Sequence, residues 1–246
     1  MTTGTTSVLR PHPAQRVDEV LIRADRASVI ATLARGMAHD FRGPLQTLTL
    51  LVDPHADFLG AESSRLQAAV HDAVRDLAGT ISRFSSLYGP LEANPAPVIV
   101  EDLLAFVADL QRYQRGLSAV DLVVRSARGF PPVRGVEGHL RHALLSLIIN
   151  AKQALDGRPD GEVLLTPELV GESIQIVAED NGPGVPAGEE SRIFEPRYTT
   201  KPEALGLGLP VARHLIERDG GTLTAERRSL KPGGRFVVTL RVWRGS

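Results

Sequence analysis

Residues 174–185 read IQIVAEDNGPGV, an apolar segment with alternating polar positions that runs directly into a turn rich in Gly and Pro. A period of two between apolar residues predicts a β-strand with one buried face. The Asp-Asn-Gly-Pro sequence favours a turn, because Gly and Pro adopt backbone angles that end regular structure. The stretch therefore predicts a half-buried strand that ends in a tight turn.

Segments of the same kind lie on both sides of this strand and alternate with helical patterns. Further strands are predicted at residues 122–124, 163–165, 222–225 and 236–242, and helices at residues 100–110, 140–155 and 209–218. Helices and strands mixed in this way predict an α+β sandwich, in which helices cover one face of a mostly antiparallel sheet. We expect this domain to span residues 98–246, after a linker at residues 91–97.

The N-terminal third has a different pattern. Residues 17–52 carry apolar side chains every three or four positions, which predicts a long helix, and residues 66–87 repeat the pattern. The two helices predict a hairpin domain of residues 17–90. Because one hairpin would leave its apolar stripe exposed, we expect a homodimer in which two hairpins form a four-helix bundle. Residues 1–16 lack any apolar period and are predicted to be a flexible tail.

The composition argues against several classes of function. Lys and Arg number 28 against 29 Asp and Glu, so there is no basic excess for binding a nucleic-acid backbone. The chain has no cysteine, which excludes disulfides and thiolate metal sites and fits a reducing cytoplasm. Its longest apolar run, residues 143–149, is far shorter than the roughly 20 residues of a membrane helix. We therefore expect a soluble cytoplasmic protein with no membrane insertion and no nucleic-acid partner.

His39 is the candidate catalytic residue of the first predicted helix. It lies two residues after Met37 of the apolar stripe, so its side chain is expected to point away from the stripe into solvent. Most exposed histidines are merely solvated. Asp40 follows directly, however, and its carboxylate could accept the N–H of one ring nitrogen and make the other a better nucleophile. Pro44 would also bend the helix close to His39.

Residues 39–45 read HDFRGPL, which resembles the phosphoacceptor box of sensor histidine kinases. The resemblance implies that His39 accepts the γ-phosphoryl group of ATP and that Asp40 acts as the general base. The family commonly has Thr or Asn at the position of Gly43, where that side chain positions water for removing phosphate from the partner. Gly43 is thus a departure from the pattern.

Four further boxes of this family follow in order in the second half of the chain. The first is Asn150 in the apolar helix, with Lys152 two residues later. An Asn there could simply satisfy backbone groups, but its amide oxygen also suits Mg²⁺. The resemblance implies that Asn150 holds the metal ion and that Lys152 belongs to the same nucleotide site. Ser146 stands where the family often has another Asn.

The second and third boxes are the turn at residues 180–185 and the segment IFEPRYTTK at residues 193–201. A carboxylate at a strand end can accept the amine of adenine, and nearby glycines let the backbone approach the ring. The resemblance assigns that contact to Asp180, beside Gly182 and Gly184. The third box resembles the start of the family's ATP lid. Thr200 and Lys201 of that box are expected at the phosphates, although an exposed lysine is more often plain surface.

The last box is Gly206-Leu207-Gly208, directly before the helix predicted at residues 209–218. Glycines at a helix N-terminus present backbone N–H groups, and the positive end of the helix dipole, to a phosphate. Gly206, Leu207 and Gly208 are therefore expected to bind the nucleotide. Ala204 and Leu205 replace the Gly-Thr that usually precedes this box in the family.

Together the boxes imply a GHKL-type, or Bergerat, ATP-binding domain. They further imply a histidine kinase that uses ATP and Mg²⁺ and passes phosphate to the receiver domain of a separate response regulator, with input from a separate sensory protein. One alternative is a related ATPase of the gyrase, chaperone and mismatch-repair kind, although Ser146 replaces the water-activating glutamate of those proteins. The other alternative is a degenerate kinase that acts as a dimeric phosphotransfer or adaptor protein without ATP-dependent autophosphorylation.

Overall fold

The computed structural model describes residues 17, 19–51, 68, 70–72, 74, 75, 93–112, 120–125, 129–201, 204–226 and 232–245. Helix α1 (Glu19–Leu51) confirms the helix predicted at residues 17–52, and its side chains are described up to Ala34 and at Leu45. Of the second predicted helix, the described residues are helical. The rest of that helix and the predicted tail lie outside the described residues.

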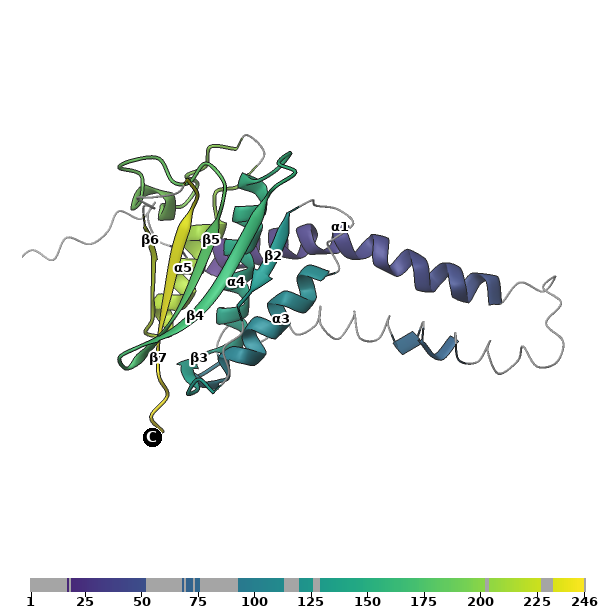
Figure 1. Ribbon diagram of the computed structural model, residues 1–246, viewed down its shortest axis with the longest axis horizontal. Coiled ribbons are helices and arrows are strands. Elements are labelled where there is room, and N and C mark those ends of the chain that lie inside the picture. Colours follow the sequence, from purple (N-terminus) through teal and green to yellow (C-terminus); the bar gives the residue numbers. More distant parts are fainter. Residues whose placement is uncertain are drawn as a thin grey trace, which may run out of the picture.

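A five-stranded sheet with the order β2-β4-β5-β7-β6 dominates the C-terminal part of the chain (Figure 1). Its strands are β2 (Asp121–Val124), β4 (Glu162–Val170), β5 (Ser173–Asp180), β6 (Thr222–Ala225) and β7 (Arg235–Arg241). β2 pairs with β4 in parallel, and the other neighbouring pairs are antiparallel. The predicted mostly antiparallel sheet is therefore confirmed.

Helices cover one face of this sheet (Figure 1). They are α3 (Val100–Arg112), α4 (Glu137–Ala154) and α5 (Gly208–Arg218). Their apolar sides and the inner face of the sheet form one core, in which Leu103, Leu144, Ile148, Ile176 and Val238 are at most 1% exposed. Burial of each such side chain contributes roughly 1.5–3 kcal/mol, which fixes the helices on the sheet. The predicted α/β sandwich is thus confirmed.

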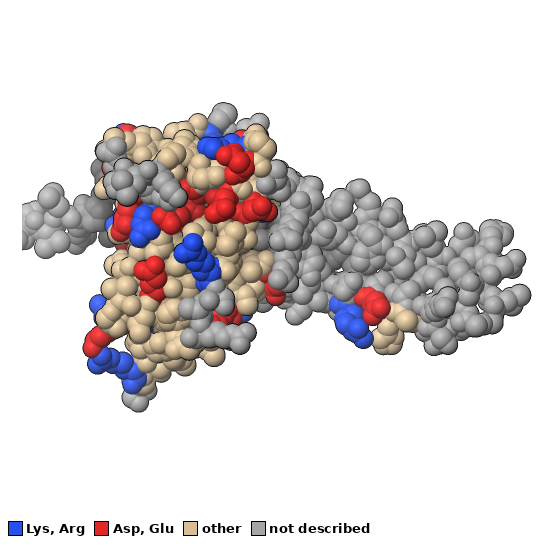
Figure 2. Space-filling model, in the orientation of Figure 1, with Lys and Arg blue, Asp and Glu red and all other residues tan. Residues whose placement is uncertain are grey.

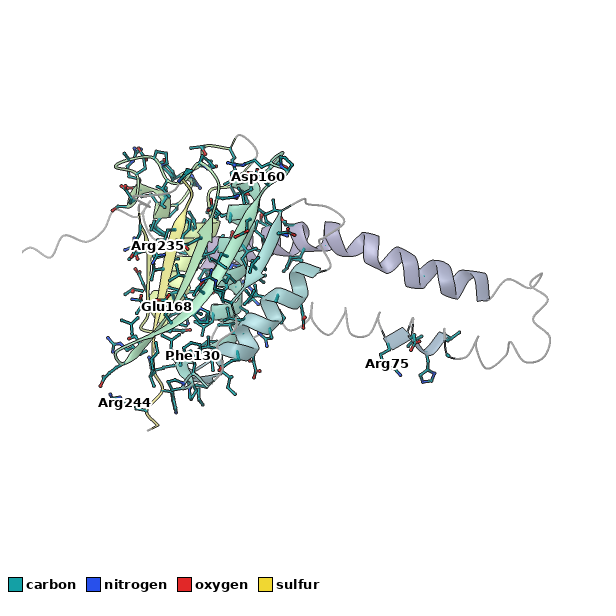
Figure 3. All side chains as sticks on the ribbon, viewed as in Figure 1. Arg75, Phe130, Asp160, Glu168, Arg235 and Arg244 are labelled. Carbon is teal, nitrogen blue, oxygen red and sulfur yellow. The ribbon has the colours of Figure 1, made fainter. Side chains whose placement is uncertain are left out.

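The opposite face of the sheet is polar, and Figure 2 shows acidic and basic side chains spread over it. Arg235, labelled in Figure 3, lies on this face in β7. Its guanidinium donates to Glu179 Oε1 and to Glu226 Oε2, each at 2.9 Å, and so links β5 and β7 to the end of β6. These ion pairs are partly exposed, so their contribution to stability is small.

Two features of the strands were not predicted. Strands β1 (Ala96–Val98) and β3 (Val133–Gly135) form a separate antiparallel pair, and three residues are too few to show a period of two. β4 also continues beyond the predicted residues 163–165, through Pro167. Proline is tolerated there because, among the described residues, β2 pairs with β4 only as far as Leu165, so that no described strand pairs with this side of β4 at Pro167.

The N-terminal half of α1 packs on the α/β domain, and the rest of the helix extends away from it (Figure 1). Val29 and Leu33 of α1 pack against Leu145 of α4. Ile22 packs against apolar side chains of α5, among them Val211. One end of the apolar stripe that was expected to lie inside a helical bundle therefore contacts the neighbouring domain. The four-helix bundle itself stays a prediction.

No helix in the described part of the chain is both long and apolar enough to cross a membrane.

Candidate functional site

A cavity of about 680 Å³ lies between α4, the N-terminal end of α5, the lid and the N-terminal half of α1. The lid is the loop between the short helix η2 (Arg192–Phe194) and α5. A cavity of this volume is typical of small-molecule sites. The predicted site residues that line it are Asn150, Gly184, Thr200, Lys201, Gly206, Leu207 and Gly208. Residues from separate boxes of the sequence therefore meet at one place.

The remaining predicted residues lie elsewhere or outside the described side chains. Lys152, Asp180 and Gly182 are described but are not among the residues that line the cavity. His39 and Asp40 belong to α1, and their side chains lie outside the described part of the chain. Their roles stay predictions.

Helix α4 places a row of polar residues on the wall of the cavity. Ser146, Asn150 and Gln153 all line it, because positions three and four apart share one face of a helix. The neighbouring Leu145 and Ile148 are fully buried in the domain and hold the row in place. Asn150 therefore lies on the cavity wall, where a metal ion or an ordered water could reach its amide oxygen.

Ser146 is 3% exposed, and its Oγ has no hydrogen-bond partner in the described part of the chain. A buried hydroxyl without a partner costs about 1–3 kcal/mol. A ligand or an ordered water in the cavity would supply the missing partner. Ser146 therefore indicates that this wall is built for contact with a polar group.

The turn after β5 is packed closely around Asp180. This residue is 5% exposed, and its Oδ1 accepts the backbone N–H of Gly182 at 2.8 Å and that of Gly234 at 3.0 Å. A Cβ on Gly234 would collide with Asp180 Oδ2, and a Cβ on Gly184 would lie 2.7 Å from the carbonyl oxygen of Gly233. Glycine is therefore needed at both positions. Contact between Asp180 and adenine stays a prediction.

Gly233 and Gly234 were missed in the sequence. They stand next to each other, and Gly234 is 54 positions from Asp180 along the chain. A pair of adjacent glycines is a weak signal of close backbone approach, and it could have been noted. Nothing in the sequence indicates which segment approaches them.

The two ends of the lid are joined. Arg197 has a positive φ of 70°, which is uncommon for a residue other than glycine, and its N–H donates to the carbonyl oxygen of Gly206 at 2.9 Å. Gly206 has a φ of 63°, and a Cβ on it would lie 2.7 Å from Tyr198 O. This junction fixes where the lid leaves the domain and where it returns.

Lys201, which lines the cavity, is partly removed from water. Burial lowers the pKa of Lys201 from its ordinary value, and the negative charge of Asp180 partly opposes this change. Lys201 Nζ donates to Gln153 Oε1 at 3.0 Å, which connects the lid to α4. Burial also lowers the pKa of Lys152. An anion bound in the cavity would favour the charged form of Lys201.

Helix α5 directs its N-terminus toward the cavity. Leu207 is its N-cap residue and makes no side-chain capping bond. The first N–H groups of a helix have no partner within the helix, and the helix dipole is positive at this end. A Cβ on Gly208 would lie 3.9 Å from Ser146 Cβ. The N-terminus of α5 and the unpartnered Ser146 hydroxyl therefore face the same space, which suits an anion.

Helix α1 supplies a further wall of the cavity. Asp25, Ser28 and Thr32 line it, at a spacing that places all three on one side of the helix. Asp25 is 4% exposed, and its Oδ2 lies 2.8 Å from Nε2 of the buried His142 of α4. These residues were missed in the sequence, because no local pattern relates two positions that are 117 residues apart.

No group of three or more His, Cys, Asp or Glu side chains among the described residues could hold a metal ion by itself. Mg²⁺ at a nucleotide site does not need such a cluster, because it keeps several waters and takes phosphate oxygens as ligands. Asn150, which lines the same cavity as the N-terminus of α5, fits this mode of binding.

Comparison with known proteins gives a consistent result. Residues 135–244 match the family of histidine kinase-, DNA gyrase B- and HSP90-like ATPases. The C4-dicarboxylate transport sensor protein DctB of Rhizobium meliloti is 28% identical over 92% of this chain and 37% of its own length. The sensor histidine kinase ZraS of Escherichia coli O157:H7 is 27% identical over 93% of this chain and 50% of its own length. This chain therefore spans half or less of these relatives.

Solved structures share the fold. The catalytic domain of the histidine kinase ThkA superposes with a TM-score of 0.55 at 24% identity, covering 61% of this chain and 97% of that one. Full-length ShkA in complex with AMPPNP superposes with a TM-score of 0.54 at 25% identity. That match covers 87% of this chain and 47% of ShkA, so it includes part of the region before the α/β domain.

Proposed function

Because this chain belongs to the sensor histidine kinases and carries a GHKL-type ATP-binding domain, we propose that it transfers the γ-phosphoryl group of ATP to His39. The phosphoryl group then passes to an aspartate on the receiver domain of a separate response regulator. We further propose that the chain acts in the cytoplasm as a homodimer, with its input supplied by a separate sensory protein.

One observation carries this proposal: the N-terminus of α5 and Asn150 line the same cavity, beside a lid that carries Lys201. A nucleoside triphosphate needs such a combination of backbone N–H groups, a hard oxygen ligand for its metal ion and a cationic side chain. The unpartnered Ser146 hydroxyl adds a polar contact. The cavity therefore suits a phosphorylated ligand.

Each group has a role that follows from its chemistry. Backbone N–H groups of residues 206–208 and the ammonium of Lys201 would orient the phosphates. Asn150 would hold Mg²⁺, which when bound would neutralise phosphate charge. Asp40 accepts the N–H of one ring nitrogen of His39. The other ring nitrogen forms the new N–P bond as the bond from the γ-phosphorus to the ADP oxygen breaks. Phosphoryl transfer depends mainly on such positioning and charge stabilisation.

The position of His39 on α1 supports this assignment. Thr32 lines the cavity, and position 39 follows it by seven residues, which is about two helical turns or roughly 10 Å along the axis. Two full turns return to nearly the same side of the helix. Helical periodicity therefore supports an acceptor position on nearly the same side of α1 as Thr32, about two turns further along the helix. A relative movement of the domain, or transfer between chains, would bring the acceptor and the cavity together.

Incubation with γ-labelled ATP and Mg²⁺ tests the proposal. We expect the parent chain to retain label, and His39→Gln and Asn150→Ala to retain less than about a tenth of it, since the first removes the nucleophile and the second the metal ligand. Phosphate on histidine should be lost in acid and survive alkali. His71→Gln and Asn94→Ala, which change exposed residues of the same types, serve as controls and should label like the parent.

Acid-stable label, or undiminished label on His39→Gln, would show that another residue is the acceptor. A parent chain that takes no label from ATP, yet accepts phosphate from a phosphorylated receiver domain, would instead identify an adaptor or phosphotransfer protein.

A further inference from the structure

We propose that Asp25 acts as an internal competitor for the phosphates of the nucleotide. Its carboxylate holds α1 against the N-terminal end of α5, so that docking of α1 and binding of a nucleoside triphosphate oppose each other. This inference rests on the proposed function, because it assumes that the phosphates bind at the N-terminus of α5.

The position of Asp25 supports the competition. It is 4% exposed and lines the same cavity as Gly206 and Asn150. A Cβ on Gly208, the first residue of α5, would lie 3.9 Å from Asp25 Oδ1. The carboxylate therefore lies beside the helix end where an anionic ligand would bind. A negative side chain at a helix N-terminus is favourable, so this position stabilises docked α1.

A second contact orients the carboxylate. Asp25 Oδ2 lies 2.8 Å from Nε2 of His142, and the side chains of both residues are at least 94% buried. The ring N–H donates to the carboxylate, which directs the other oxygen toward α5. One carboxylate oxygen of Asp25 thus contacts α4, and the other faces the N-terminus of α5, where the phosphates are proposed to bind. This arrangement suits a carboxylate that takes the place of a phosphate better than one that binds a metal ion.

Apolar packing on both sides of Asp25 makes the docked state a defined structure. Ile22 packs on α5 one turn before Asp25, and Val29 packs on α4 one turn after it. Phosphates at the N-terminus of α5 would introduce several negative charges close to the Asp25 carboxylate, which is itself 4% exposed. Repulsion there would weaken docking, and by reciprocity docked α1 would weaken binding of the nucleotide.

The consequence is a coupling between the nucleotide and the acceptor helix. In the docked arrangement position 39 lies 14 residues beyond Asp25, which is roughly 21 Å along α1. Release of α1 by the nucleotide would free the domain to move toward His39. A domain with an empty site would keep α1 docked.

Nucleotide affinity of the full chain tests this coupling, with ATP and adenosine as the two ligands in the presence of Mg²⁺. We expect Asp25→Asn to lower the Kd for ATP about tenfold or more, since it removes the charge but keeps the shape and a hydrogen-bonding oxygen. The Kd for adenosine, which has no phosphate, should change less than about twofold. Glu19→Gln removes one negative charge from an exposed position of the same helix and should leave both values unchanged.

Two further measurements address docking directly. Leu33→Ala weakens the packing of α1 on Leu145 without a change of charge, and it should also lower the Kd for ATP. Hydrogen exchange of residues 19–34 in the parent should become faster when ATP with Mg²⁺ is added.

An unchanged or raised Kd of Asp25→Asn for ATP would overturn the inference. A Kd for ATP that rises in Asp25→Asn with Mg²⁺ present, but not when EDTA replaces Mg²⁺, would show instead that Asp25 is a metal ligand. These results leave the proposed function standing. Failure of the parent and of Asp25→Asn to bind either ATP or adenosine would instead overturn the nucleotide site, and the inference with it.

Discussion

Single residues of the site are constrained mainly by close backbone approach. Gly184 has a φ of 78°, and a Cβ there would meet the carbonyl oxygen of Gly233 at 2.7 Å. The residue therefore carries two separate constraints, one on its backbone angles and one on the space around it. Gly188, a few residues away, has a φ of 83° but nothing within 4 Å of a Cβ. A comparison of Gly184 with Gly188 therefore separates the effect of the backbone angle from the effect of the steric collision.

Gly184→Ala and Gly188→Ala are therefore expected to differ. The left-handed backbone costs each variant roughly 1 kcal/mol, and the collision with Gly233 should cost Gly184→Ala about 1–3 kcal/mol more. Urea unfolding of both variants beside the parent measures the difference. Equal losses of stability would show that the turn after β5 can open to admit a methyl group.

At the scale of the elements, a buried contact around Asp219 joins the start of α4 to the end of α5. Asp219, at the C-terminal end of α5, accepts the backbone N–H of Val136 at 2.7 Å and lies 3.0 Å from His139 Nδ1. Arg134 donates to the backbone oxygen of Asp219 at 3.0 Å. These bonds join the two helices at the end away from the cavity. They thereby help to set the direction in which α5 points toward the cavity.

Asp219→Ala should lower the free energy of unfolding by about 3 kcal/mol or more, because it removes the acceptor of the buried Val136 N–H and a buried contact of His139. Chemical denaturation measures the change. Glu168→Ala, which removes an exposed carboxylate of β4 labelled in Figure 3, should stay within about 0.5 kcal/mol of the parent. A loss of similar size in both variants would mean that the Asp219 contact does not join the helices.

At the scale of the whole molecule, apolar side chains remain exposed on the two helices of the predicted hairpin domain. Leu45 of α1 is 51% exposed, and Val74, in a described helical part of the second predicted helix, is 50% exposed. α1 extends away from the α/β domain, which therefore cannot cover these side chains (Figure 1). Pairing of two chains would bury them, in agreement with the predicted homodimer.

Sedimentation equilibrium should accordingly give a mass near twice that of the 26.5 kDa chain. Leu45→Glu should shift the equilibrium toward the single chain, since it places a charge in the apolar contact. Val123→Glu, a matched change at a 42% exposed position of β2, should leave the dimer intact. A parent that sediments as one chain would rule out the predicted bundle.

Much of the fold was predictable because it depends on local periodicity. Each of the predicted elements buries one face, and the apolar residues of that face repeat in the sequence with the period of a strand or a helix. These elements are the strands around β5 and the helices α1, α3, α4 and α5. Candidate residues such as Asn150 and Gly208 were found for a related reason, since each belongs to a short motif. The short strands β1 and β3 were missed because they contain too few residues for a period to appear.

The sequence by itself determined the elements, the order of the nucleotide-binding motifs and the presence of a histidine on a long helix. Only the tertiary structure decided that Asp25 would contact His142, that Gly234 would donate to Asp180 and that the Ser146 hydroxyl would be buried with no partner among the described residues. The physical reason is the range of the interactions. Helix and strand patterns depend on neighbours a few residues apart, whereas these contacts depend on how whole elements pack across the core.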